Sequence, residues 1–233
     1  MFVDLDRDLA APVGPGRHPL PDRVEFAATM GSLGFGDDHT VIVYDDRGGV
    51  IAARLWWMLR DVGHLAVQLL DGGLAAWVAT GFPVTTEPAA IVPATLSVQP
   101  GPTRQIDRAT LAQRLGAVTV LDARAPERYR GDVEPIDARA GHIPTARNAP
   151  TTDNLDNTGR FRPADELAAH YQRLSGGDEV VASCGSGVTA CHDILAMTIA
   201  GLPEPMLYPG SWSDWSESGM PIAVGDEPGD LEK

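Results

Sequence analysis

The sequence predicts an α/β protein made of two related units, each a parallel sheet flanked by helices, with the first unit incomplete at its N-terminal side. Three observations lead to this prediction: short apolar runs alternate with helical stretches, the same order of segments occurs twice, and a proline-rich segment separates the two copies. Short buried strands that alternate with helices are typical of a parallel sheet with helices on both faces.

Each half of the chain contains a β-branched run, a glycine-containing loop and an apolar helical stretch, in that order. These segments are 41–44, 45–49 and 50–60 in the first half, and 180–183, 184–187 and 188–200 in the second. The halves align at a constant offset of 138 residues, which places Asp46 on Cys184 and Trp77 on Trp215. Such self-similarity indicates an internal duplication of one α/β unit.

Proline marks the boundary between the units. Five prolines occur between positions 83 and 102, separated by Thr, Glu and Gln, which is typical of an extended linker. We therefore expect domains at 1–82 and 103–233 joined by a linker at 83–102. Within the linker, the short apolar runs 91–92 and 96–98 could add edge strands.

The second unit begins with elements that the first unit lacks. Asp107 is a predicted N-cap for a helix at 108–115, and a buried strand is predicted at 118–122. About 40 residues, including this strand, have no counterpart in the first half. The first domain is therefore expected to be N-terminally incomplete.

Composition excludes several classes of protein. The formal net charge of −14 and the pI near 4.7 argue against a nucleic-acid partner, which requires a basic surface. No secretory signal is visible at the N-terminus, and the most apolar stretch, 180–203, is too polar for a membrane span. The two cysteines, seven residues apart, suit a reducing compartment. We expect a soluble cytoplasmic protein.

The cysteine loop carries the predicted chemistry. Cys184 follows a buried strand and precedes a helix that begins near Val188. Loop amides and the positive end of the helix dipole would face its sulfur and favour the thiolate. Gly185 and Gly187 allow the loop to turn tightly and to point its amides inward. Such a loop can hold an added sulfur atom or an oxyanion.

Other uses of the two cysteines are less well supported. A cysteine phosphatase needs an arginine in the position of Ala190. The cysteine spacing, with His192 beside Cys191, does not match a zinc site, so we expect neither a metal nor an organic cofactor. Cys191 is predicted to be a core residue.

At this loop the chain resembles the rhodanese-type sulfurtransferases, specifically their two-domain, 3-mercaptopyruvate branch. The motifs behind the resemblance spread over most of the chain: Cys184-Gly185-Ser186-Gly187-Val188-Thr189-Ala190-Cys191, Asp71-Gly72-Gly73, Asp122-Ala123-Arg124, Gly141-His142-Ile143-Pro144 and Gly210-Ser211-Trp212. The resemblance implies tandem rhodanese-like domains and a cysteine that carries sulfur as a persulfide.

Carried over residue by residue, the resemblance makes Cys184 the nucleophile. Asp46 fits an inactive first domain, in which the corresponding cysteine is usually absent. Ser186 matches a serine that works with a histidine and an aspartate of the first domain, here His18 and Asp6. Such a chain could move the proton that an enolpyruvate product needs.

The resemblance also implies cations for the carboxylate of the donor. Arg128 matches the family arginine that pairs with this carboxylate, and Arg139 is a candidate for a second one. The loop residues Gly185, Gly187, Val188 and Thr189 are expected to line the donor site. Arg124 and His142 are expected to have structural roles, Arg124 in a buried ion pair with Asp122 or on a loop carbonyl.

The resulting hypothesis is transfer of sulfane sulfur from 3-mercaptopyruvate or thiosulfate to cyanide, a small thiol or a thioredoxin-like protein, with no nucleic-acid or membrane partner. Two alternatives remain open: thiosulfate:cyanide sulfurtransfer as the main activity, or a rhodanese-like module that binds sulfur without turnover. The uncharged Gly185 and Ser186 favour a carboxylate donor over a dianionic one.

Overall fold

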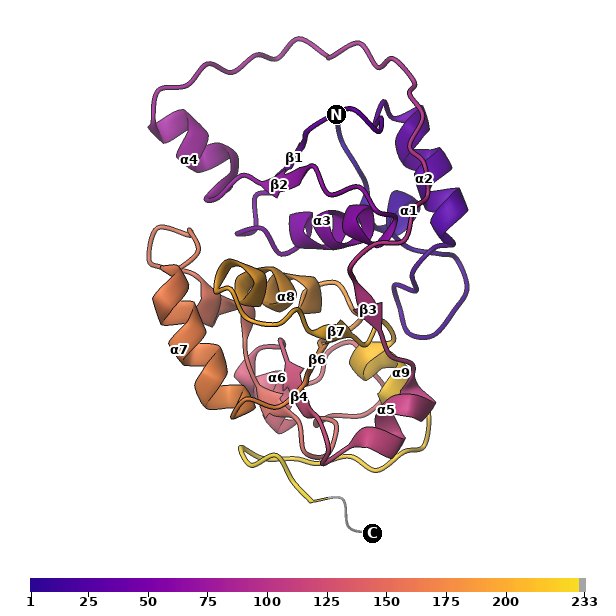
Figure 1. Ribbon diagram of the computed structural model, residues 1–233. Coiled ribbons are helices and arrows are strands. Elements are labelled where there is room, and N and C mark those ends of the chain that lie inside the picture. The colour runs from indigo at the N-terminus through magenta and orange to yellow at the C-terminus, as the bar shows by residue number, and fades with distance from the viewer. Residues whose placement is uncertain (231–233) are drawn as a thin grey trace.

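Residues 1–230 are described by a computed structural model, in which two α/β units lie one above the other and the linker arches over the first (Figure 1). The first unit contains α1 (Leu5–Asp8), α2 (Arg23–Ser32), β1 (Val41–Val43), α3 (Ala52–Asp61), β2 (Val67–Leu69) and α4 (Gly73–Ala79). The second contains β3 (Arg104–Gln105), α5 (Arg108–Arg114), β4 (Thr119–Asp122), α6 (Pro126–Arg130), β5 (Arg147–Asn148), the 3-10 helix η1 (Thr151–Asn154), α7 (Ala164–Ser175), β6 (Val180–Ser183), α8 (Ala190–Ile199), β7 (Met206–Leu207) and α9 (Ser211–Glu217).

Both sheets are parallel, as the alternating pattern predicted. The second unit has five strands in the order β3-β7-β6-β4-β5, and every residue of β4 and β6 is buried. The register pairs Asp122 with Ser183, so both strands end at the edge where the cysteine loop begins. The sheet described for the first unit has two strands, β1 and β2.

Local signals set the helix boundaries. The Asp107 carboxylate accepts from the Thr110 amide and caps α5, and the Asp22 carboxylate accepts from the amides of Val24 and Glu25 at the start of α2. No helix within residues 1–230 has both the length and the apolar character needed to cross a membrane.

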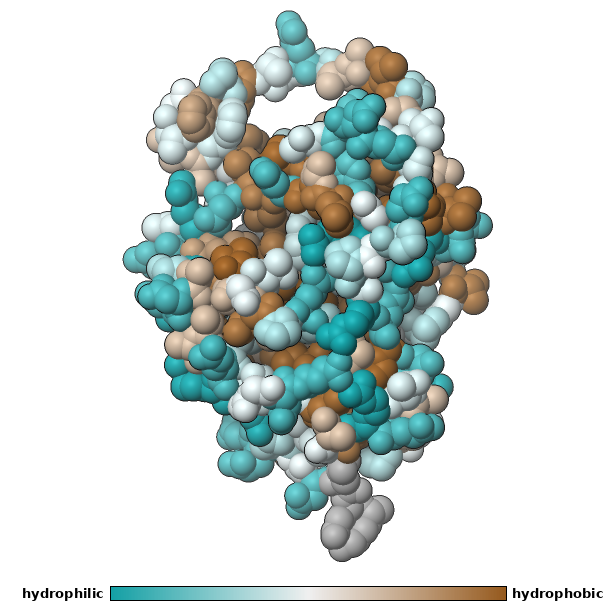
Figure 2. Space-filling model, in the orientation of Figure 1, coloured by the Kyte–Doolittle hydropathy of each residue, from teal (hydrophilic) through white to brown (hydrophobic). Residues whose placement is uncertain are grey.

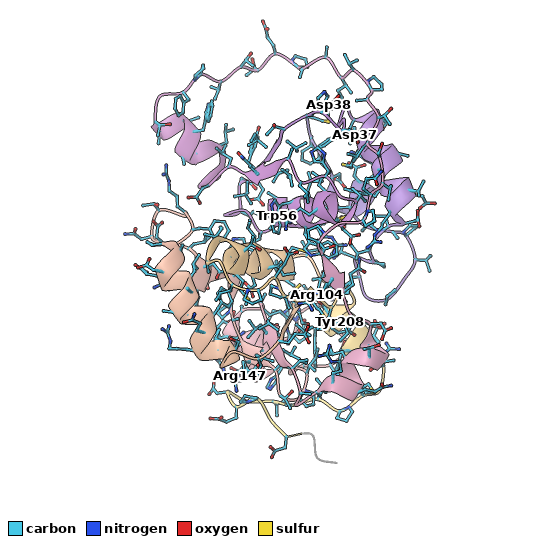
Figure 3. All side chains as sticks on the ribbon, in the orientation of Figure 1. Asp37, Asp38, Trp56, Arg104, Arg147 and Tyr208 are labelled. Carbon is cyan, nitrogen blue, oxygen red and sulfur yellow. The ribbon has the colours of Figure 1, made fainter. Side chains whose placement is uncertain are left out.

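A shared hydrophobic core joins the two units. Helix α3 of the first unit lies against α8 of the second, and Trp56, labelled in Figure 3, belongs to α3. Buried residues of α3 such as Trp57 and Leu59 form one cluster with Cys191, Ile194 and other residues of the second unit. Because this cluster is continuous, the two units are held together by packing as well as by hydrogen bonds.

The second half of the linker lies along the first unit. The linker contains no strand, so the runs 91–92 and 96–98 do not form edge strands. The Ala94 amide donates to Gly31 and the Gln99 amide donates to Val62. Figure 2 shows an opening between the linker arch and the rest of the first unit, bordered by both hydrophobic and hydrophilic residues. Ile42 and Tyr44 from the β1 segment are exposed.

A buried polar network connects the units beside this core. The His192 ring on α8 donates from Nε2 to the Gly48 carbonyl of the first unit (3.1 Å), and its Nδ1 lies 3.1 Å from the Asn154 side-chain amide. The Asn154 amide also donates to Asp193 (2.8 Å). Burial lowers the pKa of His192 to about 4, so the ring is neutral at neutral pH.

The lowered pKa of His192 predicts a loss of stability in acid. A histidine in the unfolded chain titrates near pH 6.5. The contribution of neutral His192 to the free energy of unfolding is therefore complete above this pH and is lost as the pH falls towards 4. The loss is up to about 3 kcal/mol, measured as the free energy of unfolding by urea titration at several pH values. His192→Gln should make this dependence shallower, whereas substituting the exposed His39 by Gln should not. Equal slopes for wild type and His192→Gln would contradict the prediction.

Candidate active site

Cys184 lies at the junction between β6 and α8, where its sulfur faces the backbone of its own loop. The side chain is 1% exposed, and Sγ accepts a hydrogen bond from the Gly187 amide (3.1 Å). The Cys184 amide donates to Ser211 Oγ (3.0 Å), and its carbonyl accepts from the Trp212 amide (2.9 Å). The nucleophile predicted from sequence is therefore fixed by α9 as well as by its own loop.

Gly187 is required by the shape of this loop. Its φ is +76°, and a Cβ at this position would lie 2.3 Å from the Pro209 carbonyl oxygen. The turn directs the Gly187 amide at Sγ. Within residues 1–230, the amides of Ser186, Val188 and Thr189 donate no hydrogen bond, which leaves them available to an added sulfur or an oxyanion.

Asp6, His18 and Ser186 form one hydrogen-bonded chain across the two units. His18 Nδ1 lies 2.7 Å from Ser186 Oγ, and His18 Nε2 lies 3.1 Å from Asp6 Oδ1. An ionised carboxylate can only accept, so Nε2 carries the proton and Nδ1 accepts from the Ser186 hydroxyl. The structure thus brings together three residues that are far apart in the sequence.

The environment keeps His18 neutral. Burial lowers the pKa of His18, although the Asp6 carboxylate opposes this effect. Asp6 itself is largely exposed, with 84% of its side chain accessible. A neutral imidazole beside a serine hydroxyl can accept a proton and return it.

Arg128 lies beside the loop, on the C-terminal part of α6. Its Nη1 is 3.5 Å from the position that a Cβ on Gly185 would occupy. The guanidinium donates to Glu134 (2.6 Å) and to Asp137 (3.2 Å). Burial alone would raise the pKa of Glu134, but Arg128 and the amides of Asp137 and Ile136 hold it below its usual value.

A second arginine near Gly185 comes from the first unit. Arg17 Nη2 lies 3.0 Å from the Gly185 Cβ position, and Arg17 pairs with Asp137. Burial raises the pKa of Asp137, although Arg17 opposes this effect. Sequence reasoning missed Arg17, for which the one available signal was its position next to His18.

Arg139, in contrast, is used for structure. Its guanidinium donates to the carbonyls of Ser216 (2.7 Å) and Met220 (3.0 Å) at the C-terminal end of α9. These contacts engage the Arg139 guanidinium with backbone carbonyls, and its role as a second cation for the donor stays a prediction. The Ser216 carbonyl is one of the acceptors left open by the end of α9, and Arg139 satisfies it.

The residues expected to be structural have structural contacts. Arg124 is buried, donates to both Asp122 oxygens and to the Gly141 carbonyl (2.7 Å), and lies over the Trp212 ring. His142 is buried and bonds through Nδ1 to the Tyr129 carbonyl (2.8 Å). These contacts hold the strand end and the turn beneath the cysteine loop.

The corresponding loop of the first unit is filled by Asp45. Its carboxylate accepts from four backbone amides at 2.8 Å each, those of Arg47, Gly49, Ile51 and Ala52. Burial raises the pKa of Asp45, but these four hydrogen bonds outweigh it and the pKa is lowered. The offset alignment placed Asp46 here, yet Asp46 is exposed. The carboxylate in the loop thus belongs to the residue before it.

A tandem α/β architecture with a cysteine at a strand-to-helix junction, faced by loop amides and by a polar chain from the other unit, defines a rhodanese-like protein with a thiol site. The rhodanese-like domain family matches residues 12–80 and 107–218. The chain belongs to this family.

Named relatives agree with the assignment. The chain is 49% identical to a probable 3-mercaptopyruvate sulfurtransferase of Pseudomonas aeruginosa, over 97% of this chain and 83% of the relative. It is 41% identical to a putative thiosulfate sulfurtransferase, SseB, of Mycobacterium tuberculosis, over 93% and 78% of the two chains. The crystal structure of the 3-mercaptopyruvate sulfurtransferase SseA of Escherichia coli superposes with a TM-score of 0.78 at 34% identity, covering 91% and 81%. The resemblance to the two-domain rhodanese-type sulfurtransferases that the sequence motifs indicated is confirmed.

The geometry of Gly187 predicts the effect of adding one methyl group. Gly187→Ala should destabilise the protein by more than the roughly 1–2 kcal/mol of a left-handed alanine, because the methyl also meets the Pro209 carbonyl. It should also remove the amide contact to Cys184 and slow alkylation of this thiol. Gly176→Ala is the matched control, since Gly176 has φ +63° and open space around it. Equal loss of stability in both variants, measured by chemical denaturation, would contradict the account.

Proposed function

We propose that this protein is a sulfurtransferase that takes sulfane sulfur from 3-mercaptopyruvate onto Cys184 and passes it to a thiophilic acceptor. The observation that carries the proposal is the hydrogen-bonded chain Asp6–His18–Ser186 beside the Cys184 loop. The names of the P. aeruginosa and E. coli relatives support the same donor.

The chemistry of this donor requires a proton transfer. The Cys184 thiolate attacks the sulfur of 3-mercaptopyruvate, the carbon–sulfur bond breaks, and its electron pair leaves with the carbon as the enolate of pyruvate. The proton of the donor's thiol must reach this carbon to give pyruvate and the Cys184 persulfide anion. Ser186 and the neutral His18 can pass this proton, with Asp6 orienting the ring.

The remaining residues bind charge. Arg128 is proposed to pair with the donor's carboxylate, because its Nη1 is the guanidinium nitrogen on the Gly185 side. The amides of Gly187, Val188 and Thr189 are proposed to hold the anionic sulfur after transfer. These assignments place hydrogen-bond donors, the Arg128 guanidinium and the loop amides, next to an anionic donor in a negatively charged protein.

The second half-reaction regenerates the thiolate. A nucleophile such as cyanide or a thiolate attacks the outer sulfur of the persulfide, and Cys184 leaves as its thiolate. A small thiol or a reduced thioredoxin-like protein would serve, and both suit the reducing cytoplasm that we propose for a protein with two free cysteines.

Intact-mass analysis tests the sulfur-transfer step. Wild-type protein incubated with 3-mercaptopyruvate should gain one sulfur atom, which cyanide then removes. Cys184→Ser should gain none. Cys191→Ser should behave like the wild type, because burial raises the pKa of the Cys191 thiol to about 12. A wild type that never gains sulfur, or a Cys184→Ser variant that does, would overturn the mechanism.

Ser186→Ala should affect the rates of persulfide formation from 3-mercaptopyruvate and from thiosulfate differently. With 3-mercaptopyruvate the variant should form persulfide about 10²–10⁴-fold more slowly in single-turnover mixing, because the proton path is cut. Thiosulfate gives sulfite and the persulfide without moving a proton, so its rate should change little. A comparable loss with both donors would indicate that Ser186 shapes the loop and does not transfer protons.

A further inference from the structure

Arg54 lies on α3 of the first unit and reaches across to the cysteine loop. Its side chain is 0% exposed. Nη1 donates to the Gly187 carbonyl (3.1 Å), and Nη2 donates to the carbonyls of His18 (3.1 Å) and Leu9 (3.3 Å). One guanidinium therefore holds the loop of Cys184, the segment that carries His18, and the end of the segment that carries Asp6.

Arg54 has no carboxylate partner among residues 1–230. Its Nε, also buried, has no hydrogen-bond partner there. Burial lowers the pKa of Arg54, but a guanidinium in a protein stays charged. A buried charge without a counter-charge is strongly unfavourable, so an anion is expected close to it.

The other cations around the loop already have counter-charges. Arg124 pairs with Asp122, Arg128 pairs with Glu134, and Arg17 pairs with Asp137. His18 is neutral because burial lowers its pKa. These groups come from the strand, helix and loop that surround Cys184, and their charges are largely cancelled before any donor binds.

Two sulfur atoms contact the peptide segment that Arg54 holds. The Gly187 carbonyl, which accepts from Arg54, also accepts from Cys191 Sγ (3.4 Å), and the Gly187 amide donates to Cys184 Sγ (3.1 Å). Cys191 remains a neutral thiol, since burial raises its pKa to about 12 and its Sγ lies 3.4 Å from the Gly187 carbonyl as a donor. Cys184 accepts the Gly187 amide and donates to no carbonyl in residues 1–230. The Asp61 carboxylate, on the same helix as Arg54, is already paired with Arg23 (2.7 Å). An anionic sulfur at Cys184 is therefore the counter-charge that the site offers to Arg54.

We propose that Arg54 is a positioning residue whose buried charge balances the anionic sulfur of Cys184, as thiolate and then as persulfide, while its three carbonyl contacts fix the loop to the His18 segment. The proposal rests on the proposed sulfur chemistry at Cys184 and extends it. It gives the first domain, which has no cysteine of its own, an electrostatic part in the reaction. Because the charge acts on the sulfur and not on the donor, both donors should depend on it.

The test is the pH dependence of Cys184 alkylation by iodoacetamide without any sulfur donor, with the modified residue located by peptide fragmentation. Wild-type Cys184 should become reactive with a midpoint clearly below the value of about 8.5 for free cysteine. In Arg54→Met the midpoint should rise by about one pH unit, and persulfide formation at pH 7 should fall about tenfold with both donors. Arg54→Lys, which keeps the charge, should keep the wild-type midpoint.

Arg60→Met is the matched control, because Arg60 lies on the same helix and also reaches the second unit, where it pairs with Glu204 (2.8 Å). It should leave the alkylation profile unchanged. An Arg54→Met profile that overlays the wild type would overturn the proposal. If Arg54→Met does not fold, a wild-type midpoint at the free-cysteine value overturns it, as does an Arg54→Lys midpoint raised by a full unit. If every variant shows the alkylation profile predicted for it but the wild type takes up no sulfur from either donor, the proposed function is refuted and the role of Arg54 stands.

Discussion

The hydrogen bond from the Gly187 amide to the Cys184 sulfur is the contact on which the site depends. It exists because β6 ends one residue before the cysteine and the loop turns back through the left-handed Gly187. The carbonyl of Gly187 then points the other way, towards Arg54 of the first unit. One peptide segment thus directs a donor at the sulfur and an acceptor at a buried cation, which couples the loop to both domains.

The two halves of the duplication use the same kind of loop for different purposes. In the first unit the Asp45 carboxylate accepts from four loop amides, so these amides are not available to a transferred sulfur. In the second unit, the amides of Ser186, Val188 and Thr189, just before α8, donate no hydrogen bond within residues 1–230. The first unit contributes instead through its surface at the interface, by way of His18, Arg17 and Arg54.

Sequence patterns predicted what depends on neighbours along the chain. Strand and helix periodicity placed β6 and α8, and glycine spacing pointed to Cys184. Asp6 and His18 came only from the family resemblance, since His18 and Ser186 are 168 positions apart and no local signal joins them. Arg54 was missed because an arginine in an amphipathic helix is usually exposed. Sequence also does not reveal that the carbonyls of Ser216 and Met220 are partners of Arg139.

The central claim is that the two domains share one proton path, and a double-mutant cycle between His18 and Ser186 tests it most directly. Persulfide formation from 3-mercaptopyruvate would be timed in single turnovers for wild type, His18→Asn, Ser186→Ala and the double variant. If the residues act as one chain, the double variant should be no slower than the slower single variant, since either substitution already cuts the path. Losses that multiply in the double variant would mean that His18 and Ser186 act independently, and would contradict the account.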